Sequence, residues 1–178
     1  QYFHCLKTCT LDVPAGEVRI NVQHGLAHEL WQKTLDAEAG KSRTLDIALQ
    51  SNALPAAFGP WRSADLHVHM NYGGQYRNTP AYLVQQAKAE DLDIVHNLIV
   101  NKEERIPDIG YFQAAADKAG DADTMLWHGQ EFHTSFWGHL GLLNLDDHLL
   151  TPDFASYRHT ALASPFPHNG VIADLAHA

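Results

Sequence analysis

Hydrophobic and polar residues follow two different patterns along the chain, and the change comes near residue 60. From residue 10 to residue 50, apolar residues alternate with polar ones in short stretches that Gly and Pro interrupt. Half-exposed strands show this alternation. We therefore predict a small antiparallel β unit over 1–52, with strands at 10–13, 17–22 and 43–49. Because about 50 residues bury little apolar surface, we expect this unit to be stabilised by packing against the rest of the protein, or to lack its first strands.

Beyond a Pro- and Gly-containing linker predicted at 53–61, the pattern becomes that of alternating strands and helices. The run 92–100 is almost continuously apolar, which is typical of a strand buried on both faces of a parallel sheet. Thr79 followed by Pro80 marks a helix start. The domain 62–178 is therefore predicted to be α/β, with βαβ units. Its further elements are predicted as a helix at 79–90, a helix at 111–119, a strand at 124–128 and a helix at 171–177.

Two histidines on one predicted strand give the first half of a candidate metal site. The stretch reads Asp65-Leu66-His67-Val68-His69. Side chains alternate between the faces of a strand, so His67 and His69 point to the same side. Neutral imidazole binds zinc, iron, nickel and copper, and mixed shells of imidazole and carboxylate also accept manganese. The pair therefore predicts a metal site without naming the ion.

A carboxylate and two more histidines follow the strand predicted at 124–128. Glu131, His133 and His139 fall within the segment 128–141. The carboxyl ends of parallel strands meet at one edge of a sheet, where the active sites of such folds gather. We therefore expect Glu131 and these histidines to lie at the same rim as His67 and His69, where the carboxylate of Glu131 is able to bridge two ions.

Composition excludes some partners, and the partner we expect is a small-molecule substrate. The chain of 178 residues has a formal charge of −9 and contains 13 histidines against 12 Lys and Arg. Nucleic-acid binders usually carry a basic face, so we expect no nucleic-acid partner. No apolar run is long enough to span a membrane. The two cysteines, Cys5 and Cys9, can form a local disulfide, and the start at Gln1 suggests that something upstream has been removed, so we expect a secreted or periplasmic protein.

The motifs Asp65-Leu66-His67-Val68-His69, Gly129-Gln130-Glu131 and Gly138-His139-Leu140 resemble the PHP superfamily, most closely its CehA/McbA-type metallohydrolases. The resemblance covers about residues 60–178. It implies the N-terminal part of a distorted (β/α)7 barrel, preceded by the tail of a small β-sandwich. It also implies a metal-dependent hydrolase of ester, amide or carbamate bonds, in which a metal-activated water attacks the substrate. His67, His69, Glu131 and His139 then take the family's ligand positions.

The chain departs from the family pattern at two further ligand positions. Gln75 stands where the family has another histidine, and Ile99-Val100 where it has Asp-His. We therefore expect one or two divalent ions, of zinc, manganese or iron, rather than three. The family's last ligands lie beyond Ala178, so a C-terminal segment or a companion chain is expected to complete the site. Asp174 and His177 fall on the predicted last helix and are interpreted as structural.

Several residues near the expected site are candidates for catalysis or substrate binding. Glu131, His133 and Lys102 are the catalytic candidates, His133 as a base or a further ligand and Lys102 as a cation that steadies a developing oxyanion. The residues expected to contact substrate are Asn71, Tyr72, Tyr76, Arg77 and Asn101. The alternatives to the leading function are a PHP-type phosphoesterase and a non-catalytic, metal-holding binding or assembly module that retains the fold.

Overall fold

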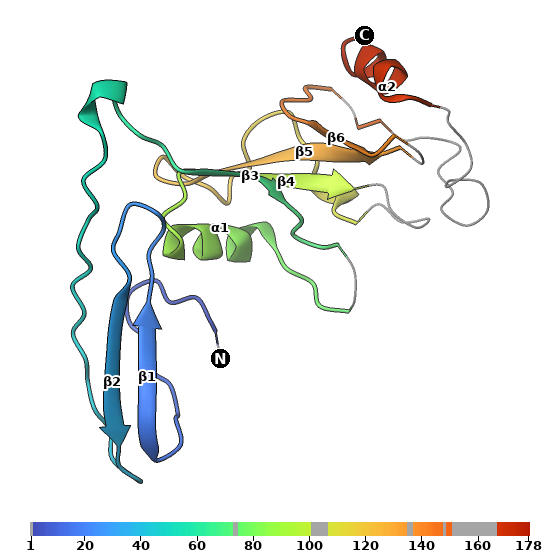
Figure 1. The fold of residues 1–178 in the computed structure, drawn as a ribbon. Coiled ribbons are helices and arrows are strands. Elements are labelled where there is room, and N and C mark those ends of the chain that lie inside the picture. Colours follow the sequence, from blue (N-terminus) through green and yellow to red (C-terminus); the bar gives the residue numbers. More distant parts are fainter. Residues whose placement is uncertain (1, 73–74, 101–106, 135–136, 148, 151–166) are drawn as a thin grey trace. The chain divides into compact units, whose positions relative to one another are not determined.

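The computed structural model describes residues 2–72, 75–100, 107–134, 137–147, 149–150 and 167–178. The chain divides into two compact units. Unit 1 comprises residues 1–63 and 85–93, and unit 2 comprises 64–84 and 94–178. Unit 1 contains a two-stranded antiparallel sheet, and unit 2 a mixed sheet of four strands that is curled like half a barrel (Figure 1). The α/β class predicted from the sequence is therefore confirmed.

The sheet of unit 1 is a hairpin of β1 (Gly16–Val22) and β2 (Trp31–Ala37). Their register runs from Gly16 opposite Ala37 to Val22 opposite Trp31. The strand predicted at 17–22 is confirmed, because Val18, Ile20 and Val22 alternate as half-buried positions with exposed polar neighbours. A short 3-10 helix, η1 (Ala56–Phe58), lies in the segment predicted as a linker.

The partner of β1 is not the strand that the sequence pattern predicts. Residues 43–49 show alternating burial but pair with no other strand in the described part of the chain, and 10–13 are not a strand either. The strand actually paired with β1 is β2, whose sequence shows only a weak period of two, because three consecutive residues from Gln32 are exposed. Pairing was therefore decided by the hairpin connection between β1 and β2, which local alternation does not encode.

The sheet of unit 2 has the strand order β3-β4-β5-β6 (Figure 1). The strands β3 (Ala64–Val68), β4 (Ile94–Val100) and β5 (Met125–His133) are parallel, and β6 (His139–Leu142) runs antiparallel to β5. The prediction of a buried parallel strand at 92–100 is confirmed by β4, of which all residues after Ile94 are buried. The edge strand β6 was not predicted.

Helix α1 (Pro80–Ala89) connects β3 to β4, as a parallel pair requires. The predicted start is confirmed, because Thr79 Oγ1 accepts the backbone N–H of Tyr82 at 3.3 Å and Pro80 is the first helical residue. The predicted C-terminal helix is confirmed as α2 (Asn169–Ala176), whose Ile172 packs with Phe132 of β5 and Leu150. No helix in the described ranges has the length and apolar character needed to cross a membrane.

The helix predicted at 111–119 is wrong. Only a 3-10 turn, η2 (Ile109–Tyr111), forms there. Asp117 instead directs the chain into turns: its carboxylate accepts the N–H of Ala119, and its own N–H donates to the carbonyl of Leu126 on β5. Aspartate competes for backbone hydrogen bonds in this way and disfavours helix interiors.

Candidate metal centre

The end of β3 directs two histidines toward β5. The register between β3 and β4 shifts between Asp65 and Val68, an irregularity of the kind that re-aims side chains at strand ends. Asp65 accepts the backbone N–H of His67 at 3.0 Å. His69 lies just after the strand, and its Nδ1 donates to the carbonyl of Leu98 at 2.9 Å, which fixes its ring.

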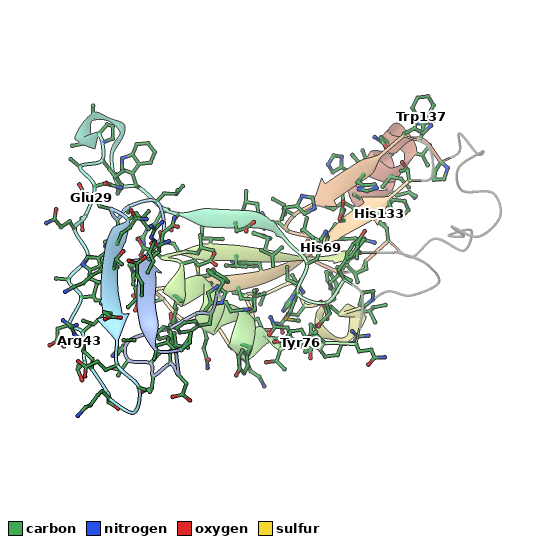
Figure 2. All side chains as sticks on the ribbon, turned by 60° about the horizontal axis from the view of Figure 1, so that its bottom comes forward. Glu29, Arg43, His69, Tyr76, His133 and Trp137 are labelled. Carbon is green, nitrogen blue, oxygen red and sulfur yellow. A yellow bond between two sulfur atoms is a disulfide. The ribbon has the colours of Figure 1, made fainter. Side chains whose placement is uncertain are left out.

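The carboxylate of Glu131 lies at the centre of four imidazoles. Glu131 is buried near the end of β5, and Figure 2 shows His69 and His133 toward the same end of the sheet. Its Oε2 is 2.7 Å from His69 Nε2 and 3.3 Å from the Nε2 atoms of His67 and His133. Its Oε1 is 2.7 Å from Nδ1 of His139 on β6. The structure thus brings together the four residues predicted as ligands, and adds His133.

The four imidazoles make two groups that share one carboxylate. His67, His69 and Glu131 place their ligand atoms within 4.8 Å of one another, and so do Glu131, His133 and His139. His133 and His139 are cross-strand neighbours whose rings stack with centroids 3.6 Å apart and planes 5° apart. Two donor sets joined by a carboxylate suit a pair of divalent ions as well as a single one.

The contact between His69 and Glu131 tests whether these residues fit a metal ion. A carbonyl only accepts hydrogen bonds, so the contact with Leu98 assigns the hydrogen of His69 to Nδ1. The neutral ring then presents a lone pair on Nε2, 2.7 Å from a carboxylate oxygen that also only accepts. Two acceptors at this distance require a positive charge between or beside them. A ligand histidine whose other nitrogen donates to a backbone carbonyl is the usual arrangement around a metal, and the residues fit a divalent cation.

Electrostatics keep Glu131 ionised and His133 neutral. Burial acts to raise the pKa of Glu131, but hydrogen bonding from His133 and the nearby His67 and His69 outweigh it, so the pKa lies below its usual value. Burial lowers the pKa of His133, against the opposing effect of Glu131. An anionic carboxylate and a neutral imidazole are the forms that bind metal.

A pocket of about 460 Å³ lies beside this cluster. Tyr72 connects the two, since its ring centroid is 5.0 Å from that of His69. Three of the predicted substrate-binding residues, Asn71, Tyr72 and Arg77, line the pocket, whereas Tyr76 does not and is 70% exposed. The predicted Asn101 and Lys102 lie outside the described residues. The lining residues that the sequence did not reveal are Asn78, Pro107, Asp108 and Tyr111.

A buried polar network supports the pocket wall. Asp108 accepts hydrogen bonds from the side chain of Asn71 at 2.6 Å and its backbone N–H at 3.1 Å. Asn97, fully buried on β4, donates to Nδ1 of His128 at 3.2 Å, and His128 Nε2 donates to Asp117 at 2.9 Å. These roles assign the hydrogen of His128 to Nε2. Asparagine in the middle of an apolar strand is the one sequence signal that could have predicted this network.

The two departures from the family pattern have no counterpart ligand in the structure. Val100 is fully buried at the end of β4, opposite Glu131, and offers no donor atom. Gln75 is exposed in the loop after β3. The described ligand set is therefore limited to the four imidazoles and Glu131.

Comparison of the chain with models of protein families, with curated proteins and with solved structures finds no match.

Proposed function

We propose that this protein is a metal-dependent hydrolase of small-molecule esters, amides or carbamates, with one or two divalent ions held by His67, His69, Glu131 and His139. The observation that carries the proposal is the buried Glu131 carboxylate with an imidazole 2.7 Å from each of its oxygens. A buried carboxylate with a single partner is a common structural ion pair. Four converging imidazoles next to a pocket are typical of a metal centre.

A divalent ion at such a site lowers the pKa of a coordinated water toward neutrality and polarises the bond to be hydrolysed. The protein's own contribution is to hold the donor atoms in place. His69 is fixed by the carbonyl of Leu98 and His139 by stacking on His133. His133 is kept neutral by burial, so it can act as a further ligand or accept a proton from the nucleophile.

The pocket favours a neutral carbonyl group over a phosphate ester. Its described lining includes one cationic side chain, Arg77, and one carboxylate, Asp108. Phosphate recognition usually depends on clusters of Arg or Lys. Tyr72 and Tyr111 offer aromatic surface, and Asn71 and Asn78 line the same wall. We therefore place the reacting carbonyl group at the edge that Tyr72 shares with His69.

Two further parts of the proposal concern the fold and the location of the protein. The four-stranded sheet with its parallel β3, β4 and β5 is proposed to be part of a PHP-type (β/α)7 barrel. A disulfide joins Cys5 to Cys9. Disulfides persist in oxidising compartments, which supports a secreted or periplasmic location.

Substitution of one ligand, with a distant histidine as control, tests the function. His67→Ala is expected to lose both bound metal and hydrolysis of nitrophenyl esters and carbamates, because sites with few ligands lose affinity steeply when one is removed. His177→Ala, at the exposed end of α2, is expected to retain both. The measurements are metal per chain by elemental analysis and the initial rate on each substrate. Equal loss in both variants would contradict the proposal.

The same assay separates the alternatives. Faster hydrolysis of nitrophenyl phosphate than of the esters would indicate the phosphoesterase. Metal binding that depends on His67, without hydrolysis of any substrate, would indicate the binding module. The feature that supports this alternative is the absence of a ligand side chain at the buried Val100 and the exposed Gln75.

A further inference from the structure

Unit 1 contains a second group of candidate ligands, which shares no residue with the Glu131 cluster. His24 and His28 lie in the connection between β1 and β2, and Asp91 lies just after α1. Their ligand atoms lie within 4.8 Å of one another, and all three residues are half-buried. They are thus close enough to share one ion and open enough to receive it.

The hydrogen bonds of His24 present a free lone pair to Asp91. His24 Nδ1 donates to the carbonyl of Ala89, the last residue of α1, at 3.0 Å. The neutral ring therefore has its lone pair on Nε2, which lies 3.6 Å from Asp91 Oδ1. This repeats the arrangement at His69, where one nitrogen donates to a backbone carbonyl and the other faces a carboxylate.

His28 completes the group from the other side of the turn. Its Nδ1 lies 2.9 Å from the carbonyl oxygen of His24 and 3.4 Å from Asp91 Oδ2. The hydrogen on this nitrogen therefore points toward two oxygen atoms. A cation that replaced the hydrogen would meet the same two oxygens and the lone pair of Nδ1.

The backbone holds the two segments in close approach. Gly25 has a φ of +61°, and a Cβ there would lie 2.7 Å from both Asp91 Cβ and the carbonyl oxygen of Glu90. Asp91 itself has a φ of +56°. The left-handed region is unusual outside glycine but is tolerated by Asp and Asn. This conformation ends α1, with Leu92 N–H bonding to the carbonyl of Ala87, and directs the Asp91 side chain to the histidines.

Local electrostatics favour a cation at this point. The carboxyl end of a helix carries partial negative charge, and here it adds to the charge of Asp91. The carboxylate of the neighbouring Glu90 has other partners. It forms hydrogen bonds with the side chains of His4, at 2.7 Å, and Tyr2, at 2.9 Å. Hydrogen bonding from His4 lowers the pKa of Glu90, so this carboxylate belongs to the contact with His4 and Tyr2 and is not one of the proposed ligands.

We propose that His24, His28 and Asp91 bind a divalent transition-metal ion of the class that includes Zn²⁺, Ni²⁺ and Cu²⁺. Two imidazoles and one carboxylate are the ligand set that these ions prefer over Mg²⁺ or Ca²⁺. The ion would join the turn after β1 to the end of α1, at the point where His24 already donates to the carbonyl of Ala89. Three protein ligands leave one coordination position for water.

Zinc titration of the whole chain tests this site, in a Glu131→Gln background that removes the carboxylate on which the other cluster converges. We expect calorimetry to show one Zn²⁺ per chain in this background. Adding Asp91→Asn should weaken that binding at least tenfold, because a ligand charge is lost. Asn adopts the left-handed conformation readily, so the helix end is preserved. Glu90→Gln, the same chemical change one residue earlier, is the control and should bind Zn²⁺ like the background protein.

Thermal unfolding gives a second readout that does not depend on stoichiometry. Zn²⁺ should raise the Tm of Glu131→Gln and of its Glu90→Gln derivative, but not that of its Asp91→Asn derivative. The proposal is overturned if the Glu131→Gln protein binds no Zn²⁺, or if Asp91→Asn and Glu90→Gln affect binding equally. Neither result depends on hydrolytic activity, so the failure of this site and the failure of the proposed function are distinguishable.

Discussion

At the scale of single residues, the described histidines differ in whether their ring nitrogens have polar partners. His69, His128 and His139 each have a ring nitrogen within 2.9 Å of an oxygen acceptor. Nδ1 of His96 on β4, by contrast, is buried without a hydrogen-bond partner in the described part of the chain. Its ring stacks on Trp127 with centroids 6.3 Å apart. Burial of an unsatisfied nitrogen costs free energy, so His96 is a weak point of the sheet.

His96→Leu is expected to raise the free energy of unfolding at pH 7.5 by about 1 kcal/mol, because it removes this buried nitrogen at similar volume. Burial, together with charge repulsion from His128, lowers the pKa of His96. The unfolded chain therefore binds a proton near pH 6.5 that the folded protein binds only at lower pH. Stability is lost as the pH falls below about 6.5, at up to about 1.4 kcal/mol per pH unit for this group.

Urea denaturation at pH 7.5 and pH 5.5 measures both effects. The variant should lose less stability between the two pH values than the wild type does. An equal loss in both proteins would show that other groups cause the acid sensitivity.

At the scale of elements, β5 determines the geometry of the metal centre. The sequence predicts a strand at 124–128, but β5 continues to His133 and thus carries Glu131 and His133. These residues look like a polar loop because local pattern reading treats Glu and His as surface residues. Glu131 can be buried only because other elements supply polar partners for its carboxylate. These partners are His69, which follows β3, and His139 on β6.

Gly129 is the position in β5 where the sheet tolerates no side chain. A Cβ there would lie 2.6 Å from the carbonyl oxygen of Leu142 on β6 and 3.1 Å from Leu98 Cδ2. Gly129→Ala is therefore expected to destabilise the protein by about 1–3 kcal/mol and to weaken metal retention, because β6 carries His139. Denaturant unfolding and metal per chain are the measurements.

Gly141 on β6 provides the matched control. A Cβ at this position would meet only Leu98 Cδ1, at an ordinary contact distance of 3.8 Å. Gly141→Ala should leave both the unfolding midpoint and the metal content close to the wild type. If the two alanine variants behave alike, the close approach of β5 and β6 does not control the site.

At the scale of the whole molecule, each unit has its own histidine cluster, and we expect protons to compete with metal at both. Ligand histidines bind metal only when neutral, so metal affinity should fall as the pH drops below their reference pKa of about 6.5. We expect hydrolytic activity to decline below about pH 6. Undiminished activity near pH 5, with metal present in excess, would contradict this.

The number of ions follows from the ligands that are present. Asp91→Asn removes the proposed site of unit 1, so this variant should bind at most two ions per chain, both at the Glu131 cluster. The reason is that the described ligands of this cluster are four imidazoles and one carboxylate, which form two groups around Glu131. Native mass spectrometry counts the ions. Three ions in the Asp91→Asn protein would mean that His96 or His128 also serves as a ligand.

The sequence alone determined the elements whose signals are local. Thr79-Pro80 marks the start of α1, and the apolar run of β4 marks a buried parallel strand, because caps and burial on both faces leave a direct trace in residue type. His67 lies on β3 and His69 directly follows it, and their convergence with Glu131 and His139 was expected from the rule that strand ends meet at one edge. The family resemblance added roles, which remain predictions.

Only the tertiary structure decided which distant segments meet. No short sequence pattern connects the residues that meet in four places. These are the pairing of β1 with β2, the antiparallel pairing of β6 with β5, the pocket wall that includes Asp108 and Tyr111, and the approach of Asp91 to His24. The helix predicted at 111–119 failed for the same reason. The N–H of Asp117 donates to the carbonyl of Leu126, and its carboxylate accepts from His128. Such distant partners override local propensity because a polar group removed from water is stable only where the fold supplies its partner.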